Sequence, residues 1–195
     1  MFDNHYGLTQ AVVEHRKTNT RRIITNPDII QSLIEIEDDG DLTGTDAKII
    51  IDNCATYKIG EIVAVAQCLR DMGYDPKDRS NGHIWGLDHE VAWTNKMFVS
   101  AKQCIHHIKI TNVRVERLQD ISNEDCLREG ICHQSFEQED HDGVTYWDSG
   151  YAFDGSRLIY NTPREAFVAL IDKVSGKGTW ESNPFVFVYE FELVK

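Results

Sequence analysis

The sequence predicts an α+β fold built around a small, mostly antiparallel β-barrel with short flanking helices and two loop insertions. Short β-branched and aromatic segments are separated by only a few amphipathic stripes, without the strand–helix–strand rhythm of a parallel sheet. The chain has 195 residues, of which 41% are hydrophobic. This length and composition predict one domain over residues 1–195 with a core of its own.

Two helices are expected in the first 40 residues. An apolar stripe predicts a short helix over residues 8–15. A second helix begins at Asn26-Pro27, an N-cap followed by proline in the first turn. Its apolar residues recur at helical spacing: Ile29, Ile30, Leu33 and Ile34.

Strands are expected in the middle of the chain. Short β-branched runs predict strands over residues 48–51 and 61–67, with a turn at residues 57–60 between them. The clearest strand covers residues 108–118. Its apolar side chains change parity halfway along, which predicts a β-bulge near Asn112.

The last third of the chain carries the clearest helix boundaries. Ser122 as N-cap and Gly130 as C-terminal stop predict a short helix. The capping box TPRE at residues 162–165 begins a longer helix that ends at Gly176. Residues 185–193 are apolar on both parities at first and alternate later, which predicts a strand that runs from the core to a sheet edge.

Two segments are predicted to be loop insertions, at about residues 70–95 and 132–158. The first is rich in Gly, Asp and Asn, and the second is acidic and aromatic. Both are expected to lie outside the barrel and to border the same opening. The aromatic residues of the second insertion have two interpretations, stacking on bases or packing as the apolar side of a hairpin: Tyr146, Trp147, Tyr151 and Phe153.

Charge and cysteine content restrict the classes of function. A formal net charge of −12 repels polyphosphate at long range, so any contact with nucleic acid must be local. Five widely spaced cysteines fit reduced thiols, and the sequence shows no signal peptide and no run of about 20 apolar residues. We therefore expect a cytoplasmic protein that does not enter a membrane.

Neither a metal nor a cofactor is expected. A zinc site would have to draw on residues whose spacing matches no standard finger: Cys126, Cys132, His133 and His141. The acidic stretch at residues 137–142 lacks the spacing of a calcium loop and fits a solvated loop better.

One segment contrasts with the acidic chain. Residues 14–24, EHRKTNTRRII, concentrate four cations and two threonines, and no carboxylate occurs from His15 to Pro27. The segment is either a solvated strand edge with a lysine that deters edge pairing, or a site for an anionic ligand. The residues concerned are Arg16, Lys17, Thr18, Thr20, Arg21 and Arg22.

Several segments resemble one known family. These segments are RKTNTRRI, YKIGEIVAVAQ, VRVERLQDISNEDCLREGI, TPREAFVALID and WESNPFVFVYEFEL. They are similar to the ASCH domain of the PUA-like superfamily, in the variant common in bacteriophages and Bacteroides-type genomes. The resemblance runs from about residue 5 to residue 193 and covers both insertions poorly. It implies a PUA-like β-barrel of phage or prophage descent, with a cleft that accepts RNA or a modified nucleoside.

The resemblance also implies a set of site residues. One bacterial branch of the family hydrolyses N4-acetylcytidine, and the residues of its site fall on Lys17, Thr20, Arg22 and Glu129. In such chemistry Thr20 is the nucleophile if Lys17 is neutral, and Glu129 orients the lysine or passes a proton to the leaving amine. On a straight strand Lys17 and Thr20 point to opposite faces, so the chain must turn between them.

Three functions remain open at this point. The first is a module that binds RNA or a nucleoside-like small molecule in a basic cleft formed by Arg16, Lys17, Thr18, Thr20, Arg21, Arg22 and Glu129. The second is an amidohydrolase of an acylated nucleoside that uses Lys17, Thr20 and Glu129. The third is a phage-derived protein-interaction module, in which the acidic surface and the insertions would contact a protein partner. For the first two, Glu129 is expected to reach Lys17 or Arg22 while the other cations stay available.

Overall fold

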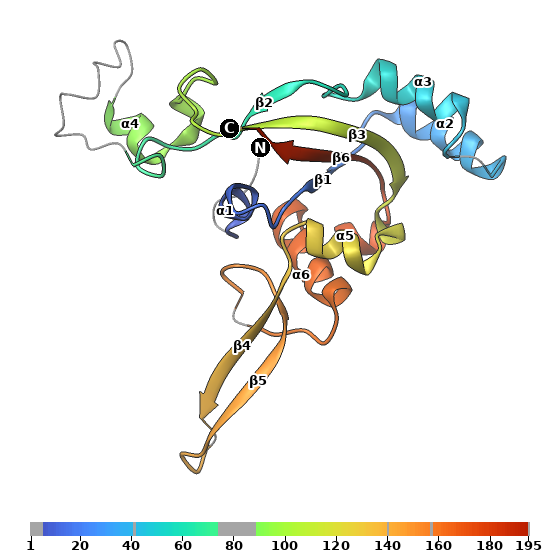
Figure 1. Ribbon diagram of the computed structural model, residues 1–195. Coiled ribbons are helices and arrows are strands. Elements are labelled where there is room, and N and C mark those ends of the chain that lie inside the picture. The colour runs from blue at the N-terminus through green and yellow to red at the C-terminus, as the bar shows by residue number, and fades with distance from the viewer. Residues whose placement is uncertain (1–5, 41, 74–88, 140, 157, 195) are drawn as a thin grey trace.

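The computed structural model describes residues 6–194, except residues 41, 74–88, 140 and 157. Four antiparallel strands form the central sheet in the order β1 (Asn19–Ile23), β6 (Phe185–Leu193), β3 (His107–Arg117) and β2 (Ile62–Ala64). The sheet curls into a half-barrel (Figure 1). Its two end strands, β1 and β2, are not paired with each other in the described part of the chain. The antiparallel prediction is therefore confirmed, and the described strands form an open half-barrel.

The longest strands of the sheet follow their sequence patterns closely. The ladder between β3 and β6 shifts register between Ile110 and Asn112, which confirms the predicted bulge. One sheet contains β1 together with the strands predicted at residues 108–118 and 185–193. However, β6 does not reach a sheet edge, because β1 and β3 pair with it on both sides. Its aromatic face and its valine face are both buried, as in an interior strand.

Helices α1 (Leu8–Val13), α5 (Asn123–Arg128) and α6 (Pro163–Ser175) lie on one side of the sheet (Figure 1). Local signals set their boundaries. The Ser122 hydroxyl accepts a hydrogen bond from the Asp125 amide, and the Thr162 hydroxyl accepts one from the Glu165 amide. The short elements η2 (Leu118–Asp120) and α7 (Thr179–Ser182) connect these helices to the sheet.

Helices α2 (Pro27–Asp38) and α3 (Thr45–Cys54) pack together at one end of the sheet (Figure 1). The predicted strand at residues 48–51 is wrong, because these residues lie inside α3. Ala47, Ile50 and Ile51 turn inward at helical spacing, whereas Ile49 between them is 52% exposed. The helical period therefore overrides the β preference of three consecutive isoleucines. The predicted strand at residues 61–67 is shorter than expected, since the regular strand covers Ile62–Ala64.

The second insertion is not a loop. Strands β4 (Cys132–Glu139) and β5 (Thr145–Ala152) pair over their full length and form a hairpin that projects from the body of the molecule (Figure 1). Phe153 at its base is buried, whereas Trp147 is 72% exposed. The extended pairing was missed because β4 contains no β-branched residue and β5 contains only Thr145.

Only part of the first insertion is described. It includes α4 (His89–Thr94), which the 3₁₀ helix η1 (Lys96–Phe98) follows, while residues 74–88 of the predicted loop lie outside the described residues. The prediction that both insertions border the same opening involves residues 74–88 as well, so it stays a prediction. None of the described helices is long and apolar enough to cross a membrane.

Candidate functional site

The turn after α1 places Lys17 in the site. His15 has a left-handed backbone with φ of 59°, and the amides of Arg16 and Lys17 both donate to the carbonyl of Ala11, at 2.8 and 2.9 Å. The helix therefore ends abruptly, and Lys17 enters before the regular strand β1 begins. Because the chain turns here, the opposite facing expected for Lys17 and Thr20 on a straight strand does not apply. Both residues line the same cavity.

The end of α5 places Glu129 opposite Lys17. Glu129 caps the C-terminus of the helix, and Gly130 follows with φ of 104°, a backbone conformation that favours glycine. The backbones of Lys17 and Glu129 form an isolated antiparallel bridge. The amide of Thr18 also donates to the carbonyl of Arg128 at 2.9 Å. Two helix ends are thus joined through their backbones before any side chain contributes.

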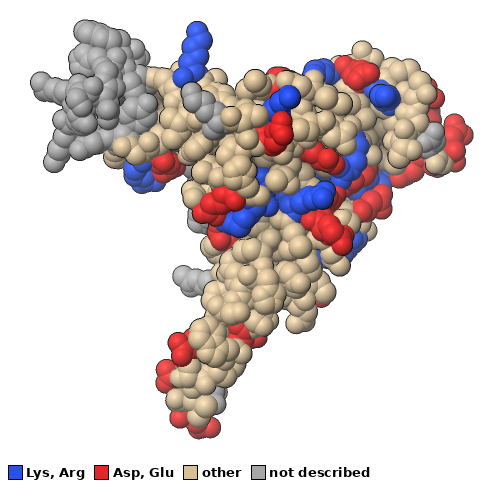
Figure 2. All heavy atoms as spheres, in the orientation of Figure 1, with Lys and Arg blue, Asp and Glu red and all other residues tan. Residues whose placement is uncertain are grey.

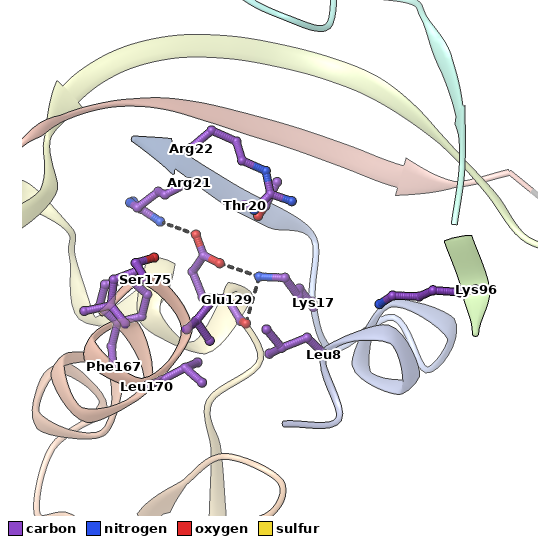
Figure 3. Close-up of a pocket in the computed structure, with 12 residues that line it drawn as sticks. Leu8, Lys17, Thr20, Arg21, Arg22, Lys96, Glu129, Phe167, Leu170 and Ser175 are labelled. Carbon is purple, nitrogen blue, oxygen red and sulfur yellow. Dashed lines mark hydrogen bonds and ion pairs between the residues drawn. The ribbon is translucent and has the colours of Figure 1, made fainter. Parts of the chain in front are cut away.

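A buried ion pair joins the two side chains. The ammonium of Lys17 donates to the Glu129 carboxylate and, at 2.9 Å, to the carbonyl of the same residue (Figure 3). The side chains are 2% and 6% exposed. Burial lowers the pKa of Lys17 from its ordinary value, and the negative charge of Glu129 opposes this shift. The predicted meeting of Glu129 with Lys17 is confirmed.

Arg21 connects Glu129 to a larger ionic network. Its guanidinium donates to Glu116 at 2.7 and 2.9 Å, to Asp125 at 3.0 Å and to Glu129 at 3.0 Å. Arg114 binds Glu116 and Asp125 as well. The expectation that Arg21 stays available for a ligand is therefore wrong. Three carboxylates already neutralise it, and through one of them it holds Glu129 from the side opposite Lys17.

These residues border a cavity of about 350 Å³ between β1, α5 and α6 (Figure 3). One wall is charged and polar, and the opposite wall is apolar. Among the described residues that line it, the polar ones are Lys17, Thr20, Arg21, Arg22, Lys96, Glu129 and Ser175. The apolar ones are Leu8, Phe167, Leu170, Ile171 and Val174. This volume and this contrast of walls suit a small molecule with both an apolar part and polar groups.

A smaller cavity of about 120 Å³ adjoins the first one. Thr20 and Arg22 line both cavities. The smaller one lies between the two unpaired edges of the half-barrel, since β2 contributes Val63 and Ala64 to its lining. Its other described lining residues are largely apolar or aromatic: Tyr57, Ala66, Ile108, Ile110, Tyr189 and Phe191. Thr20 and Arg22 therefore stand between a charged space and an aromatic one.

Five of the seven predicted site residues line the larger cavity, namely Lys17, Thr20, Arg21, Arg22 and Glu129. Arg16 and Thr18 are not among its described lining residues, which corrects their assignment. Arg16 turns away to Glu14 and Asp154, at 2.7 and 3.2 Å. The backbone of Thr18 is held by Arg128 and by Phe191, whose amide donates to the Thr18 carbonyl at 2.8 Å.

Sequence reasoning missed the apolar wall and Lys96. The helical spacing of Phe167, Leu170, Ile171 and Val174 after TPRE predicts the buried face of α6, and the first three are indeed buried. The same face continues to Val174, which is 38% exposed. An apolar stripe that extends beyond the core in this way is a signal for a binding wall. Lys96 follows the first insertion, and its sequence gives no signal that would place it here.

The described residues contain no group of three His, Cys, Asp and Glu side chains able to hold a metal ion. Cys126 is fully buried in the core, where burial raises the pKa of its thiol to about 12.

Comparison with known proteins identifies no relative: no family model, no curated protein and no solved structure matches the chain.

Proposed function

We propose that this protein binds a nucleoside-like small molecule, or a single nucleotide of RNA, in the cavity between β1, α5 and α6. The observation that supports the proposal is the opposition of Arg22 and Lys96 to an apolar wall built on Phe167 and Leu170 (Figure 3). A base ring would pack on the apolar wall, while its acceptor atoms and the sugar or phosphate would face the cations. The strongly negative surface favours a short ligand over a long polyanion.

We further propose that the chain is an ASCH-type module of the PUA-like superfamily, of phage or prophage descent, that works in the cytoplasm. Three observations support this. The central sheet is antiparallel and curled, and the four residues implied by the resemblance, Lys17, Thr20, Arg22 and Glu129, all line one cavity. The five cysteines are free, which fits a reducing compartment.

Calorimetric titration with cytidine, N4-acetylcytidine, their 5′-monophosphates and short single-stranded RNA tests binding. Thr20→Val removes the hydroxyl from the cavity wall at nearly constant volume, and Thr18→Val is the matched control just outside that wall. Arg22→Met removes one cation. We expect Thr20→Val and Arg22→Met to weaken binding about tenfold each, the effect of one or two lost polar contacts. Absence of binding by every ligand, or equal loss in Thr20→Val and Thr18→Val, would contradict the proposal.

A second candidate function is hydrolysis of an acylated amine on such a nucleoside. It is favoured because Thr20, Lys17 and Glu129 share one cavity and because burial lowers the pKa of Lys17. The ammonium of Lys17 would first pass a proton to Glu129, and the neutral amine would then accept the Thr20 proton as the hydroxyl attacks the acyl carbonyl. The carbon–nitrogen bond then breaks, the amine leaves with a proton, and water releases the acid from the threonine ester.

Mass spectrometry of N4-acetylcytidine after incubation separates the two functions. Release of acetate and cytidine that is lost in Thr20→Val and kept in Thr18→Val supports the hydrolase. Tight binding without release of acetate supports the binding module alone.

A further inference from the structure

The hairpin formed by β4 and β5 exposes large apolar side chains on both of its faces. Trp147 is 72% exposed, Tyr146 is 47% exposed and Phe136 is 36% exposed. Alternation along the strands places Phe136 and Tyr146 on one face and Trp147 on the other. A two-stranded sheet is marginally stable when nothing covers it, and exposed aromatic groups of this kind mark interaction sites.

The hairpin is also uniformly acidic. Residues 132–152 contain no Lys or Arg, and they contain five carboxylates: Glu137, Glu139, Asp140, Asp142 and Asp148. In the space-filling view, acidic atoms and no basic ones appear on the half of the hairpin that is distant from the body of the molecule (Figure 2). Such a surface repels nucleic acids and anionic membranes. It also repels the same surface of a second copy.

The strand register brings aromatic and acidic groups together on one face. Glu137 lies directly opposite Trp147, and Glu139 lies opposite Thr145, two residues further along. All four residues share the Trp147 face because side chains at alternate positions point the same way. No salt bridge joins Glu137 or Glu139 to another residue within the described ranges. An exposed indole flanked by two carboxylates is a receptor for a guanidinium, which stacks on the ring and donates to the carboxylates.

We propose that the Trp147 face of the hairpin docks an arginine-rich segment of a protein partner. Charge complementarity selects this occupant, and the planar guanidinium selects arginine over lysine. The proposal concerns a surface separate from the cavity, so it does not depend on which ligand the cavity takes.

Fluorescence anisotropy with labelled nona-arginine and nona-lysine peptides tests the proposal at physiological ionic strength, about 0.15 M. The wild-type protein is expected to bind nona-arginine more tightly than nona-lysine. Trp147→Ser leaves the charge unchanged, and it should weaken nona-arginine binding about fivefold to tenfold and abolish the preference over nona-lysine, as loss of a cation–π contact predicts. Unchanged nona-arginine binding in Trp147→Ser would overturn the proposal.

A charge-matched pair separates the hairpin from the acidity of the whole chain. Two double variants each remove two exposed carboxylates. Glu137→Gln/Glu139→Gln removes them from the hairpin, and Glu35→Gln/Asp38→Asn removes them from α2. We expect only the hairpin pair to reduce the arginine preference. Equal losses from both pairs would show that bulk charge alone attracts the peptide and would overturn the proposal. So would light scattering that shows a dimer in the wild type and a monomer in Trp147→Ser, since a second copy would then be the occupant.

Discussion

The ammonium of Lys17 and the carboxylate of Glu129 form a buried ion pair between residues 112 positions apart in the chain. The pair joins the end of α1 to the end of α5, and Arg21 holds its acidic member from the other side. The polar wall of the cavity is therefore part of the buried structure of the protein. Changes in this wall should affect folding as well as binding.

Lys17→Met should reduce the free energy of unfolding by about 3 kcal/mol, because it leaves Glu129 buried without one of its two cationic partners. Lys48→Met, on the exposed face of α3, is the matched control and should change stability by less than about 0.5 kcal/mol. Urea denaturation measures both values. Similar small effects for the two variants would show that the ion pair contributes little.

Gly130→Ala should destabilise the protein by about 1 to 2 kcal/mol, because its φ of 104° strains any residue with a Cβ atom. Gly40→Ala carries a similar backbone cost, at φ of 84°, in a position with open space around it. Only Gly130→Ala should also weaken ligand binding, because it shifts the Glu129 carbonyl that accepts from Lys17. Thermal unfolding and calorimetric titration of the two variants test the difference. Equal binding by both would contradict it.

Glu37 should contribute stability that depends on pH. Hydrogen bonds from Arg117 lower the pKa of Glu37 from its ordinary value of 4.5. Because the folded-state pKa is the lower one, the contribution is complete above about pH 4.5 and is lost as the pH falls through the folded-state value. The stability difference between wild type and Glu37→Gln should therefore shrink in acid. Urea midpoints from neutral pH to about pH 3 measure it, with Glu35→Gln as the control on the same helix.

Cys126 should resist alkylation in the folded protein. Burial raises the pKa of its thiol to about 12, so almost no thiolate forms at about pH 8, whereas Cys54 is exposed. Iodoacetamide followed by peptide mass spectrometry should label Cys54 first, and both residues only after denaturation. Equal early labelling of Cys126 would mean that α5 opens readily.

Local signals predicted the helix boundaries well. Ser122 and Thr162 form the N-caps expected of them, because a capping hydrogen bond depends on only three or four consecutive residues. The bulge near Asn112 was also predictable, since a change of parity is visible within one strand. The helix at residues 48–51 was not predictable from the sequence. Its β-branched composition conflicts with a helical period that only packing against α2 reveals.

The site was predictable only in part, for a similar reason. The resemblance placed Lys17, Thr20, Arg22 and Glu129 together, and the structure gathers them around one cavity. Neutralisation of Arg21 could not be predicted, because Glu116 lies on β3 and β6 separates that strand from β1. Contacts across an intervening strand depend on two registers at once, and neither register is visible in one sequence.

The gap between the unpaired edges of β1 and β2, here called the seam of the half-barrel, gives the smaller cavity an adjustable width. Thr20 and Arg22 stand on one side of the seam, and Val63 and Ala64 stand on the other. Because no ladder of hydrogen bonds joins these two edges in the described strands, they can separate or approach without breaking any pairing within the sheet. A change in the curl of the sheet would therefore widen or narrow the smaller cavity while β2 stays paired with β3, and only side-chain contacts across the cavity would change.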